Sequence, residues 1–495
     1  MQSSQNLYDV VAYPRLAFSD THPDRLATMA ILHGLTPAPV ERCRMLEVAC
    51  NEGANLIPMA YAIPGSEFVG FDLAHAPIER GQQRIRELGL KNIRLFAADM
   101  MEVGPELGEF DYIVAHGFYS WVPAPVRERL LEMCSELLAP NGIAFVSYNA
   151  LPGGFVRDAI RQIMLYRVNG PEQLEERTRE AFELTHFLLA SRPEDDAYRQ
   201  LMEKHLKKMG EHSAPSTFHD ELSEAFHSLS FAEFMQHAQR HGLQYLSEAA
   251  LPPPNDPCYR EEIRAAIETV APGDLIAQEQ MLDFARARKF RQTLLCRADR
   301  SVRRDYPPEV FRRMLLASQA KSAPGDTPGA MIFTLPGDIK MEVNHPGVIR
   351  LMEELERAWP RALSLEELET RLAGTGLFFD ANGATLLMRI AAAKFIELHA
   401  WRPQFPARIP EHPRASASSR QEVGAGTQAA TLLHSMVRLD DEVAQKFFLL
   451  LDGTRDRAAL LEVLKAKFPE IPAADLETQL EPSLEYFYRA GFIEA

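Results

Sequence analysis

The chain has 495 residues, a formal net charge of −16 and a sequence pI near 5.5. This length exceeds what one hydrophobic core usually holds, and the acidic balance argues against a general nucleic-acid binder, whose phosphate contacts require clustered Lys and Arg. No apolar run approaches the roughly 20 residues that cross a bilayer, and the five cysteines include no Cys-x-x-Cys pair, so we expect a cytoplasmic protein without disulfides.

Strand and helix patterns alternate between residues 44 and 149. Short apolar or β-branched runs predict strands at 44–49, 67–73, 93–99, 110–117 and 142–149. Helical patterns separate them at 55–62, 77–88 and 125–138. This order predicts an α/β fold, a parallel sheet with right-handed crossovers and helices on both faces, whose ligands bind outside the carboxyl ends of the strands.

The first predicted strand ends in a turn of small residues. The spacing is Glu47-x-Ala49-x-Asn51-x-Gly53, and the second strand closes at Asp72. A small-residue turn lets the backbone approach a ligand, while a carboxylate at the tip of the next strand accepts hydrogen bonds from two ribose hydroxyls. The spacing fits Glu/Asp-x-Gly-x-Gly-x-Gly better than the dinucleotide form Gly-x-Gly-x-x-Gly. It therefore predicts a site for S-adenosylmethionine.

Long helical patterns follow the fifth predicted strand, at 155–166 and 171–209, the second of them broken by a turn at 193–196. They predict a helical insertion that covers a substrate. An amphipathic helix at 230–241 then precedes an alternating run at 243–248.

A further helix, at 274–288, leads into a strand pattern at 290–298. This strand and the run at 243–248 are predicted to pair and to complete a seven-stranded sheet.

From about residue 304 the pattern indicates small helical units. Residues 345–398 predict three helical segments and a closing strand, and residues 440–495 repeat the three-helix plan. Residues 403–429, rich in Pro, Ser, Ala and Gly, predict an exposed linker. Because neither third helix is strongly basic, we favour winged-helix-like docking modules, or a homodimer formed through them, over DNA reading.

Several stretches resemble the class I methyltransferases that carry a methyltransferase regulatory domain, a group similar to the protein lysine methyltransferases that modify outer-membrane proteins in some intracellular bacteria. The resemblance rests on Tyr13-Pro14, Thr21–Thr28, Met45–Pro58, Gly70–Leu73, Phe110–Pro123, Val146–Asn149 and, for the regulatory segment, Phe290–Cys296. The chain departs from the family at Ala49, Asn51 and Ala54, where glycine is usual, and at Gly154, where tryptophan is usual. Asn tolerates positive φ better than other non-glycine residues, so the turn can survive at Asn51.

The resemblance and the patterns together imply six segments. They are a methyltransferase core (1–153), a helical insertion (154–214), a regulatory segment that completes the sheet (215–303), a winged-helix-like module (304–402), a linker (403–429) and a second small helical module (430–495).

The predicted cofactor site lies at the carboxyl ends of the strands. Its residues are Glu47, Ala49, Asn51, Gly53, Asp72, Leu73, Asp99, Met100 and His116. Asp72 is expected to accept the ribose hydroxyls, with a helix N-cap as the alternative, and Asp99 the adenine amino group, with a turn residue as the alternative. The resemblance implies that Glu47 contacts the amino group of the methionine moiety, and a structural pairing with an arginine is the alternative.

The predicted catalytic residues follow the fourth and fifth strands, and they are His116, Tyr119, Trp121 and Tyr148. Aromatic faces attract a sulfonium or an ammonium, although core packing is the ordinary role of Trp and Tyr. The predicted substrate-binding residues are Tyr13, His22, Tyr119 and Asn149. Capping is the alternative for His22, Tyr148 and Asn149. No metal site is expected, and His205, His212, His219 and His227 are read as surface histidines.

These residues predict an S-adenosylmethionine-dependent methyltransferase, and the resemblance implies a protein lysine as acceptor. Burial of a lysine amine disfavours its charge, so transfer is feasible without a dedicated base, and His116 would serve as the base for a hydroxyl acceptor. A small-molecule methyltransferase is one alternative. A partner-binding protein with a degenerate cofactor site, suggested by Ala49 and Asn51, is the other.

Overall fold

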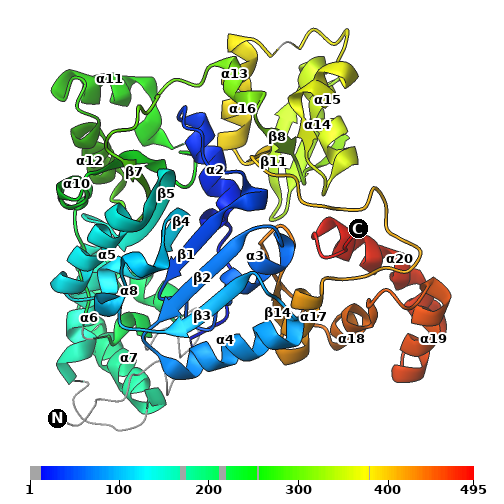
Figure 1. Cartoon of the computed structure of the whole chain (residues 1–495), viewed down its shortest axis with the longest axis horizontal. Helices are drawn as coiled ribbons and strands as arrows, with labels where there is room; N and C mark the ends of the chain where they lie inside the picture. The colour runs from blue at the N-terminus through cyan, green and yellow to red at the C-terminus, as the bar shows by residue number, and fades with distance from the viewer. Residues whose placement is uncertain (1–12, 168–173, 211–218, 224, 254–255, 378) are drawn as a thin grey trace.

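A seven-stranded sheet organises the N-terminal part of the chain in the computed structural model, which describes residues 13–167, 174–210, 219–223, 225–253, 256–377 and 379–495 (Figure 1). The strands are β1 (Arg44–Val48), β2 (Glu67–Asp72), β3 (Ile93–Ala97), β4 (Phe110–Ala115), β5 (Leu138–Asn149), β6 (Leu243–Glu248) and β7 (Phe290–Arg297). Their order is β3-β2-β1-β4-β5-β7-β6. Strands β1 to β5 pair in parallel, whereas β7 pairs antiparallel with both β5 and β6, so the predicted seven-stranded sheet is confirmed.

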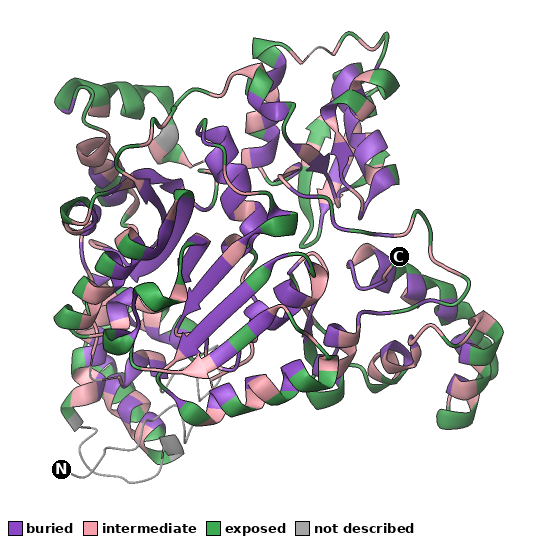
Figure 2. Cartoon of the chain, viewed as in Figure 1, coloured by how far each residue is buried: buried purple, intermediate pink, exposed green. Residues whose placement is uncertain are grey.

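Helices cover both faces of this sheet, and the central strands β1 and β4 are almost entirely buried, whereas the edge strand β3 is partly exposed (Figure 2). Alternate residues of a strand face opposite sides, so Met45 packs with one set of helices and Leu46 with the other. The first set contains α2 (Pro23–Leu32), α3 (Leu56–Ala62) and α4 (His75–Leu88). The second set contains α5 (Ala124–Leu137) and α10 (Phe231–Arg240).

The predicted helical insertion forms three helices with a small core of its own. They are α6 (Phe155–Arg167), α7 (Leu174–Ala190) and α8 (Ala197–Met209). The side chain of Asp196 accepts a hydrogen bond from the backbone N of Arg199 at 2.9 Å and so begins α8 after the predicted turn. Residues 171–173, at the start of the second predicted helix, lie outside the described residues.

The regulatory segment contributes more than its two strands. Helix α10 begins with a capping box, because Ser230 and Glu233 bond each other's backbone N–H groups. Two further helices, α11 (Glu261–Val270) and α12 (Leu275–Arg286), lie between β6 and β7. The buried Arg291 of β7 pairs with Asp283 of α12 at 2.7 Å, which fastens this helix to the sheet.

The unit at 304–402 is mixed rather than helical. The expected helices are present as α14 (Pro346–Ala358), α15 (Leu365–Arg371) and α16 (Ala381–Ala392). The unit also contains short strands: β8 (Leu315–Ala317), β9 (Lys321–Pro324), β10 (Met331–Leu335), β11 (Ile339–Val343), β12 (Leu363–Ser364) and β13 (Glu397–His399). Strand β9 has no buried residue and no alternating apolar pattern. Strand β11 is largely exposed, although Ile339, Met341 and Val343 alternate with polar residues, and the sequence interpretation did not include it.

The last unit begins earlier than its helical pattern suggests. Its helices are α17 (Ala417–Ala425), α18 (Glu442–Leu450), α19 (Arg457–Lys467) and α20 (Ala473–Arg489), and a hairpin of β14 (Gln428–Ala430) and β15 (Met436–Arg438) follows the first. Helix α17 falls inside the segment 403–429, which was predicted as an exposed linker. That prediction is wrong for α17, because Glu422 and Val423 are buried.

Both C-terminal units pack against the sheet domain. Glu422 of α17 forms a buried ion pair with Arg84 of α4 at 2.7 Å. His399 of β13 pairs with Asp24 of α2, also at 2.7 Å. In Figure 1 the two units lie to the right of the sheet and the regulatory segment to its left. Within the described parts of the chain, no helix is both long and apolar enough to cross a membrane.

The sheet topology predicts the effect of a truncation. A chain that ends near residue 215 lacks β6 and β7, so β5 loses the antiparallel partner that covers it from Ala144 to Asn149. An unpaired edge with buried apolar side chains should pair with other chains, so we expect this fragment to aggregate. Size-exclusion chromatography and thermal unfolding beside the full chain measure this. A soluble monomer that unfolds cooperatively would contradict the assignment of β6 and β7 to the sheet.

Candidate active site at the carboxyl ends of the strands

Five predicted site residues lie at one edge of the sheet. Because β1 to β5 are parallel, their carboxyl ends lie at the same edge. Glu47 lies near the end of β1, Asp72 ends β2, Asp99 and His116 follow β3 and β4, and Asn149 ends β5. The structure therefore brings these five residues together on one side of the sheet, as predicted.

The turn after β1 alternates between left-handed and ordinary backbone. Ala49, Asn51 and Gly53 have φ values of +55°, +50° and +71°. A side chain in this region costs roughly 1–2 kcal/mol, which explains why glycine is common at such positions and why Asn is the milder substitute. The carboxylate of Asp72 compensates, since its Oδ2 accepts a hydrogen bond from the backbone N of Asn51 at 2.9 Å. Its Oδ1 accepts one from Ala74 N at 2.9 Å, so Asp72 fixes both the turn and the start of α4.

Two buried oxygens at this edge, Glu47 Oε2 and Asn51 Oδ1, have no hydrogen-bond partner among the residues that the structure describes. The side chain of Glu47 bonds instead through Oε1, which accepts from Asn55 Nδ2 at 2.7 Å. Burial raises the pKa of Glu47 to about 8, the Asn55 hydrogen bond opposes this, and the charge of Asp72 adds to it. Unpaired buried acceptors are rare in proteins, so this pair marks a place where a donor or a cation fits. The alternative pairing of Glu47 with an arginine is not observed among the described residues.

No pattern in the sequence indicated the central role of Asn55, a residue that is 4% exposed and lies behind the turn. Its Nδ2 also donates to Thr21 Oγ1 at 2.9 Å. Its Oδ1 accepts from the backbone N of Phe18 at 2.9 Å and from His434 Nε2 at 2.8 Å. One amide therefore joins the segment before α2, the edge of the sheet and the C-terminal unit.

Glu52 is a second residue that the sequence interpretation missed. Its buried carboxylate forms ion pairs with Arg15 and, at 2.9 Å, with Arg80 of α4. The pair with Arg15 holds the N-terminal segment against the turn, and the pair with Arg80 joins the turn to α4. A glutamate beside a turn that is predicted to bind a ligand does not by itself indicate a buried ion pair, because most glutamates are surface residues.

Leu73, Asp99 and Met100 continue the predicted cofactor site along the edge. The side chain of Leu73 is 59% exposed, which is unusual for leucine and leaves an apolar surface beside Asp72. Asp99 is exposed, and its Oδ1 accepts from Met101 N at 2.9 Å and begins a short 3₁₀ turn. Met100 is buried in the core. Their roles toward a cofactor stay predictions.

His116 and Asn149 border the side of the edge that faces the insertion. His116 Nδ1 lies 3.2 Å from Ser147 Oγ, and its ring centroid is 4.0 Å from that of Phe18. Burial lowers the pKa of His116 to about 4, so the ring is neutral near pH 7 and a weak base. Asn149 Oδ1 accepts from Arg157 Nη1 of α6 at 3.1 Å, and Arg157 pairs with Glu221 at 2.7 Å.

Tyr119 and Tyr148, predicted as catalytic, lie in the core between the sheet and α10. Tyr119 Oη is 2.6 Å from His237 Nδ1, and burial raises the pKa of Tyr119 to about 12. Tyr148 Oη is 3.3 Å from Thr293 Oγ1, and its ring stacks on Phe234. Both hydroxyls thus have partners in the core, in keeping with the packing alternative, and their catalytic role stays a prediction.

Trp121, the remaining predicted catalytic residue, faces the insertion. The guanidinium carbons of Arg157 and Arg161 lie 4.9 and 5.4 Å from its ring centroid. The ring of Phe226 lies 4.8 Å from that of Trp121. Two resident cations therefore already contact the aromatic ring that was expected to attract one.

Tyr13 and His22 are separated in the structure. Tyr13 Oη donates to Asp220 Oδ1 at 3.5 Å, next to the insertion. His22 Nδ1 accepts from Asp24 N at 3.1 Å and caps α2, as the alternative interpretation holds, and its ring lies 5.2 Å from that of His434. Among the expected surface histidines, His219 is instead buried and His212 lies outside the described residues.

Three family models match the chain in order: a methyltransferase domain at 46–144, a predicted methyltransferase regulatory domain at 215–297, and a PKMT C-terminal winged helix domain at 411–471. An uncharacterized protein of Rickettsia prowazekii is 35% identical over 234 residues, which are 47% of this chain and 94% of that relative. The chain belongs to this family of methyltransferases with a regulatory domain. Another uncharacterized protein of the same organism is 33% identical over 319 residues, 63% of this chain but only 56% of that relative.

A solved structure shares the fold of nearly all of this chain. PKMT2 from Rickettsia typhi has a TM-score of 0.85 and 23% identity, and the match covers 98% of this chain and 100% of that one. Its complex with AdoHcy matches equally well, with a TM-score of 0.85 over 97% of this chain and 99% of that one. The shared fold includes both C-terminal units. The winged helix match also begins before residue 430, in agreement with the position of α17.

The environment of Glu47 predicts a pH-dependent stability. The folded chain keeps a proton on Glu47 up to about pH 8, whereas an unfolded glutamate releases it near pH 4.3. The cofactor-free protein therefore loses stability as pH rises between these values, and Glu47→Gln should not. We expect the variant's midpoint of thermal unfolding, relative to wild type, to rise from pH 5 to pH 8 and then level off. The exposed residue Glu79, changed to Gln, is the control. Parallel curves for Glu47→Gln and wild type would show that the carboxyl is ionised in the fold.

Proposed function

We propose that this methyltransferase binds S-adenosylmethionine at the edge of β1 and β2 and transfers its methyl group to a lysine side chain of a protein. The observation that carries the cofactor assignment is a pair of buried oxygens, Glu47 Oε2 and Asn51 Oδ1, which have no partner within the described parts of the chain. Asn51 Oδ1 accepts hydrogen bonds, and Glu47 Oε2 does so once the carboxyl is ionised. Both lie beside a turn whose backbone is left-handed at alternate positions.

The residues present fit this cofactor. Glu47 and Asn51 offer acceptors for the ammonium group of its methionine moiety, and that cation would favour the ionised form of Glu47. Asp72 is the acceptor for the ribose hydroxyls, and the exposed Leu73 offers an apolar surface for the base. When bound, S-adenosylmethionine supplies a methyl group carried on a sulfonium sulfur.

The protein's part in methyl transfer is to position the acceptor and to exclude water. A lysine amine must be neutral to act as a nucleophile. Arg157 and Arg161, which lie over the ring of Trp121, place positive charge on the acceptor side, and that charge lowers the pKa of an incoming amine. Glu221 offsets part of that charge through its ion pair with Arg157. An amine that is already neutral needs no base at the moment of transfer. We therefore assign no dedicated base, and His116 is a weak one.

The lysine acceptor is supported by the architecture rather than by one residue. The winged helix model that matches residues 411–471 belongs to the PKMT group, and PKMT2 of Rickettsia typhi shares the arrangement of the whole chain. A small-molecule methyltransferase has no evident use for two additional C-terminal units.

The ribose contact gives a direct test of the cofactor site. Asp72→Ala removes both acceptor oxygens, and we expect S-adenosylmethionine to bind more than about tenfold more weakly, on the order of 1.5–3 kcal/mol. Isothermal titration calorimetry measures the affinity. Because Asp72 also holds Asn51 N and Ala74 N, Asp72→Asn is the matched variant that keeps one acceptor oxygen, and thermal unfolding reports on the fold of both. Unchanged affinity in Asp72→Ala would remove the assignment.

The acceptor class is tested with labelled cofactor. We expect the full chain to transfer the labelled methyl from S-adenosylmethionine to an outer-membrane protein offered as substrate, with mass spectrometry placing it on lysine Nζ. Asp72→Ala is the inactive control. Label found in small molecules of a cell extract but not in protein would favour a metabolite acceptor. Cofactor binding without transfer to either would favour a binding protein.

A further inference from the structure

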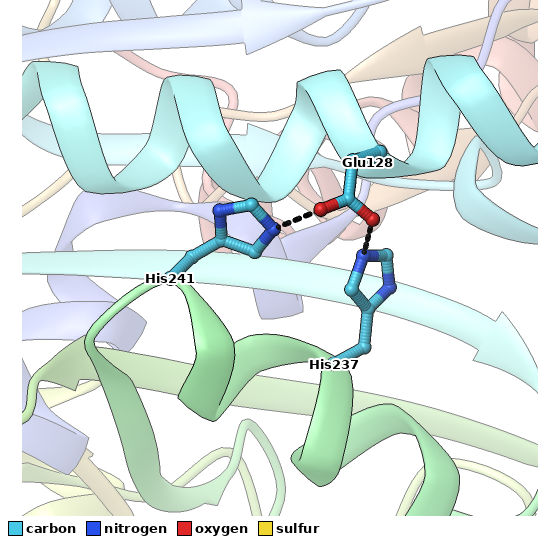
Figure 3. Close-up of side chains that lie close together, drawn as sticks. All are labelled: Glu128, His237 and His241. Atoms are coloured by element: carbon cyan, nitrogen blue, oxygen red, sulfur yellow. Dashed lines mark hydrogen bonds and ion pairs between the residues drawn. The ribbon is translucent and has the colours of Figure 1, made fainter.

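Three side chains with metal-binding atoms meet between the methyltransferase core and the regulatory segment (Figure 3). Glu128 projects from α5 and His237 from α10. His241 is the C-cap residue that directly follows α10. One ligand atom of each lies within 4.8 Å of the others. Glu128 Oε2 is 2.8 Å from His237 Nε2, and Glu128 Oε1 is 2.8 Å from His241 Nε2.

The two imidazoles converge because of their spacing. Residues four apart on a helix lie one above the other on the same face, so His237 and His241 both point toward α5. Phe234, Met235 and Ala238 of the same helix are buried in the core shared with α5. The packing of these three residues fixes the position of α10 relative to α5, so the ligand atoms are brought together by the fold.

A second contact orients His237. Its Nδ1 is 2.6 Å from the hydroxyl of Tyr119, which is itself 2% exposed and held in the core. A hydroxyl can accept from Nδ1–H, and this leaves the lone pair of Nε2 available for a metal ion. Metal-bound histidines almost always have such a partner on the other ring nitrogen.

We propose that Glu128, His237 and His241 bind a divalent transition-metal ion, with zinc as the best match, and that the ion fastens the regulatory segment to the methyltransferase core. Two imidazoles and one carboxylate are a common zinc ligand set, in which water takes the fourth position. The side chains of His237 and His241 are 12% and 15% exposed, whereas that of Glu128 is 51% exposed, so the site opens to solvent on the Glu128 side. The two ligands from α10 and the one from α5 come from different segments of the chain, and the ion would join them.

A simpler arrangement, in which the carboxylate only bridges two histidines by hydrogen bonds, uses the same contacts. Arg240 Nη2 also lies 3.7 Å from Glu128 Oε2, and its charge weakens the attraction for a cation. The two arrangements differ in one measurable way. The ion requires both imidazole lone pairs, whereas a hydrogen-bonded bridge is satisfied by any N–H donor at position 241.

The test uses the full chain, stripped of metal with a chelator and titrated with Zn²⁺ by calorimetry. Co²⁺ replaces zinc in a parallel experiment, because its visible absorption reports direct coordination. We expect saturable binding of one ion and a rise in the midpoint of thermal unfolding with added metal. His241→Gln keeps an N–H donor toward Glu128 but removes a metal ligand, and it should weaken binding at least about tenfold and abolish the rise. Glu128→Gln, at an exposed position, should do the same.

His186→Gln is the matched control, since His186 is exposed on α7 and lies outside the cluster. It should bind metal as wild type does. No binding by the wild-type chain, or binding of equal affinity in wild type and His241→Gln, would overturn the proposal and leave the hydrogen-bonded bridge. The outcome does not depend on methyl transfer, so it stands apart from the test of the proposed function.

Discussion

The side chain of Asn55 is the contact on which the arrangement of the active edge depends. Four polar groups meet at this buried amide: Glu47 of β1, Thr21, the backbone N of Phe18, and His434 of the C-terminal unit. Three of these bonds are buried and the one at Phe18 is partly buried, so groups left without a partner here would be costly. The amide satisfies all four at once, and in doing so it fixes Glu47 with one oxygen bonded and one unpartnered. Glu47, the acceptor assigned to the cofactor's ammonium group, is therefore positioned by contacts with the segment before α2 and with the C-terminal unit.

The C-terminal units consequently belong to the architecture of the site. His434 contacts Asn55 directly, Glu422 forms its ion pair with Arg84 behind the turn, and Asp24 of α2 pairs with His399. Burial works against the charge of His399, yet Asp24 raises its pKa to about 10, so this pair stays charged at neutral pH. Buried pairs of this kind add little net stability but penalise any arrangement that separates the partners. These pairs fix how the two C-terminal units dock on the sheet domain. The units therefore help to build the active edge of the same chain.

The regulatory segment approaches the sheet from the opposite side. Its strand β7 covers β5, and its helix α10 packs on α5 through Phe234 and Met235. Tyr119, which follows β4 near the active edge, is bonded to His237 of this segment. A metal ion at the Glu128 cluster would therefore bind a histidine whose other ring nitrogen contacts Tyr119, a residue of the segment that follows β4.

The sequence by itself determined the α/β core, since its strands carry continuous apolar runs and its helices carry amphipathic patterns that depend only on local spacing. It also placed Glu47, Asp72, Asp99, His116 and Asn149 at one edge, because parallel strands share a carboxyl end. It did not reveal Asn55, Glu52 or His434, whose importance arises from contacts between segments far apart in the chain. The tertiary structure alone decided that Tyr119 and Tyr148 turn into the core, that α17 is buried rather than a linker, and that His237 and His241 face Glu128. The i, i+4 spacing of the two histidines was visible in the sequence, but a carboxylate on another helix is placed only by packing.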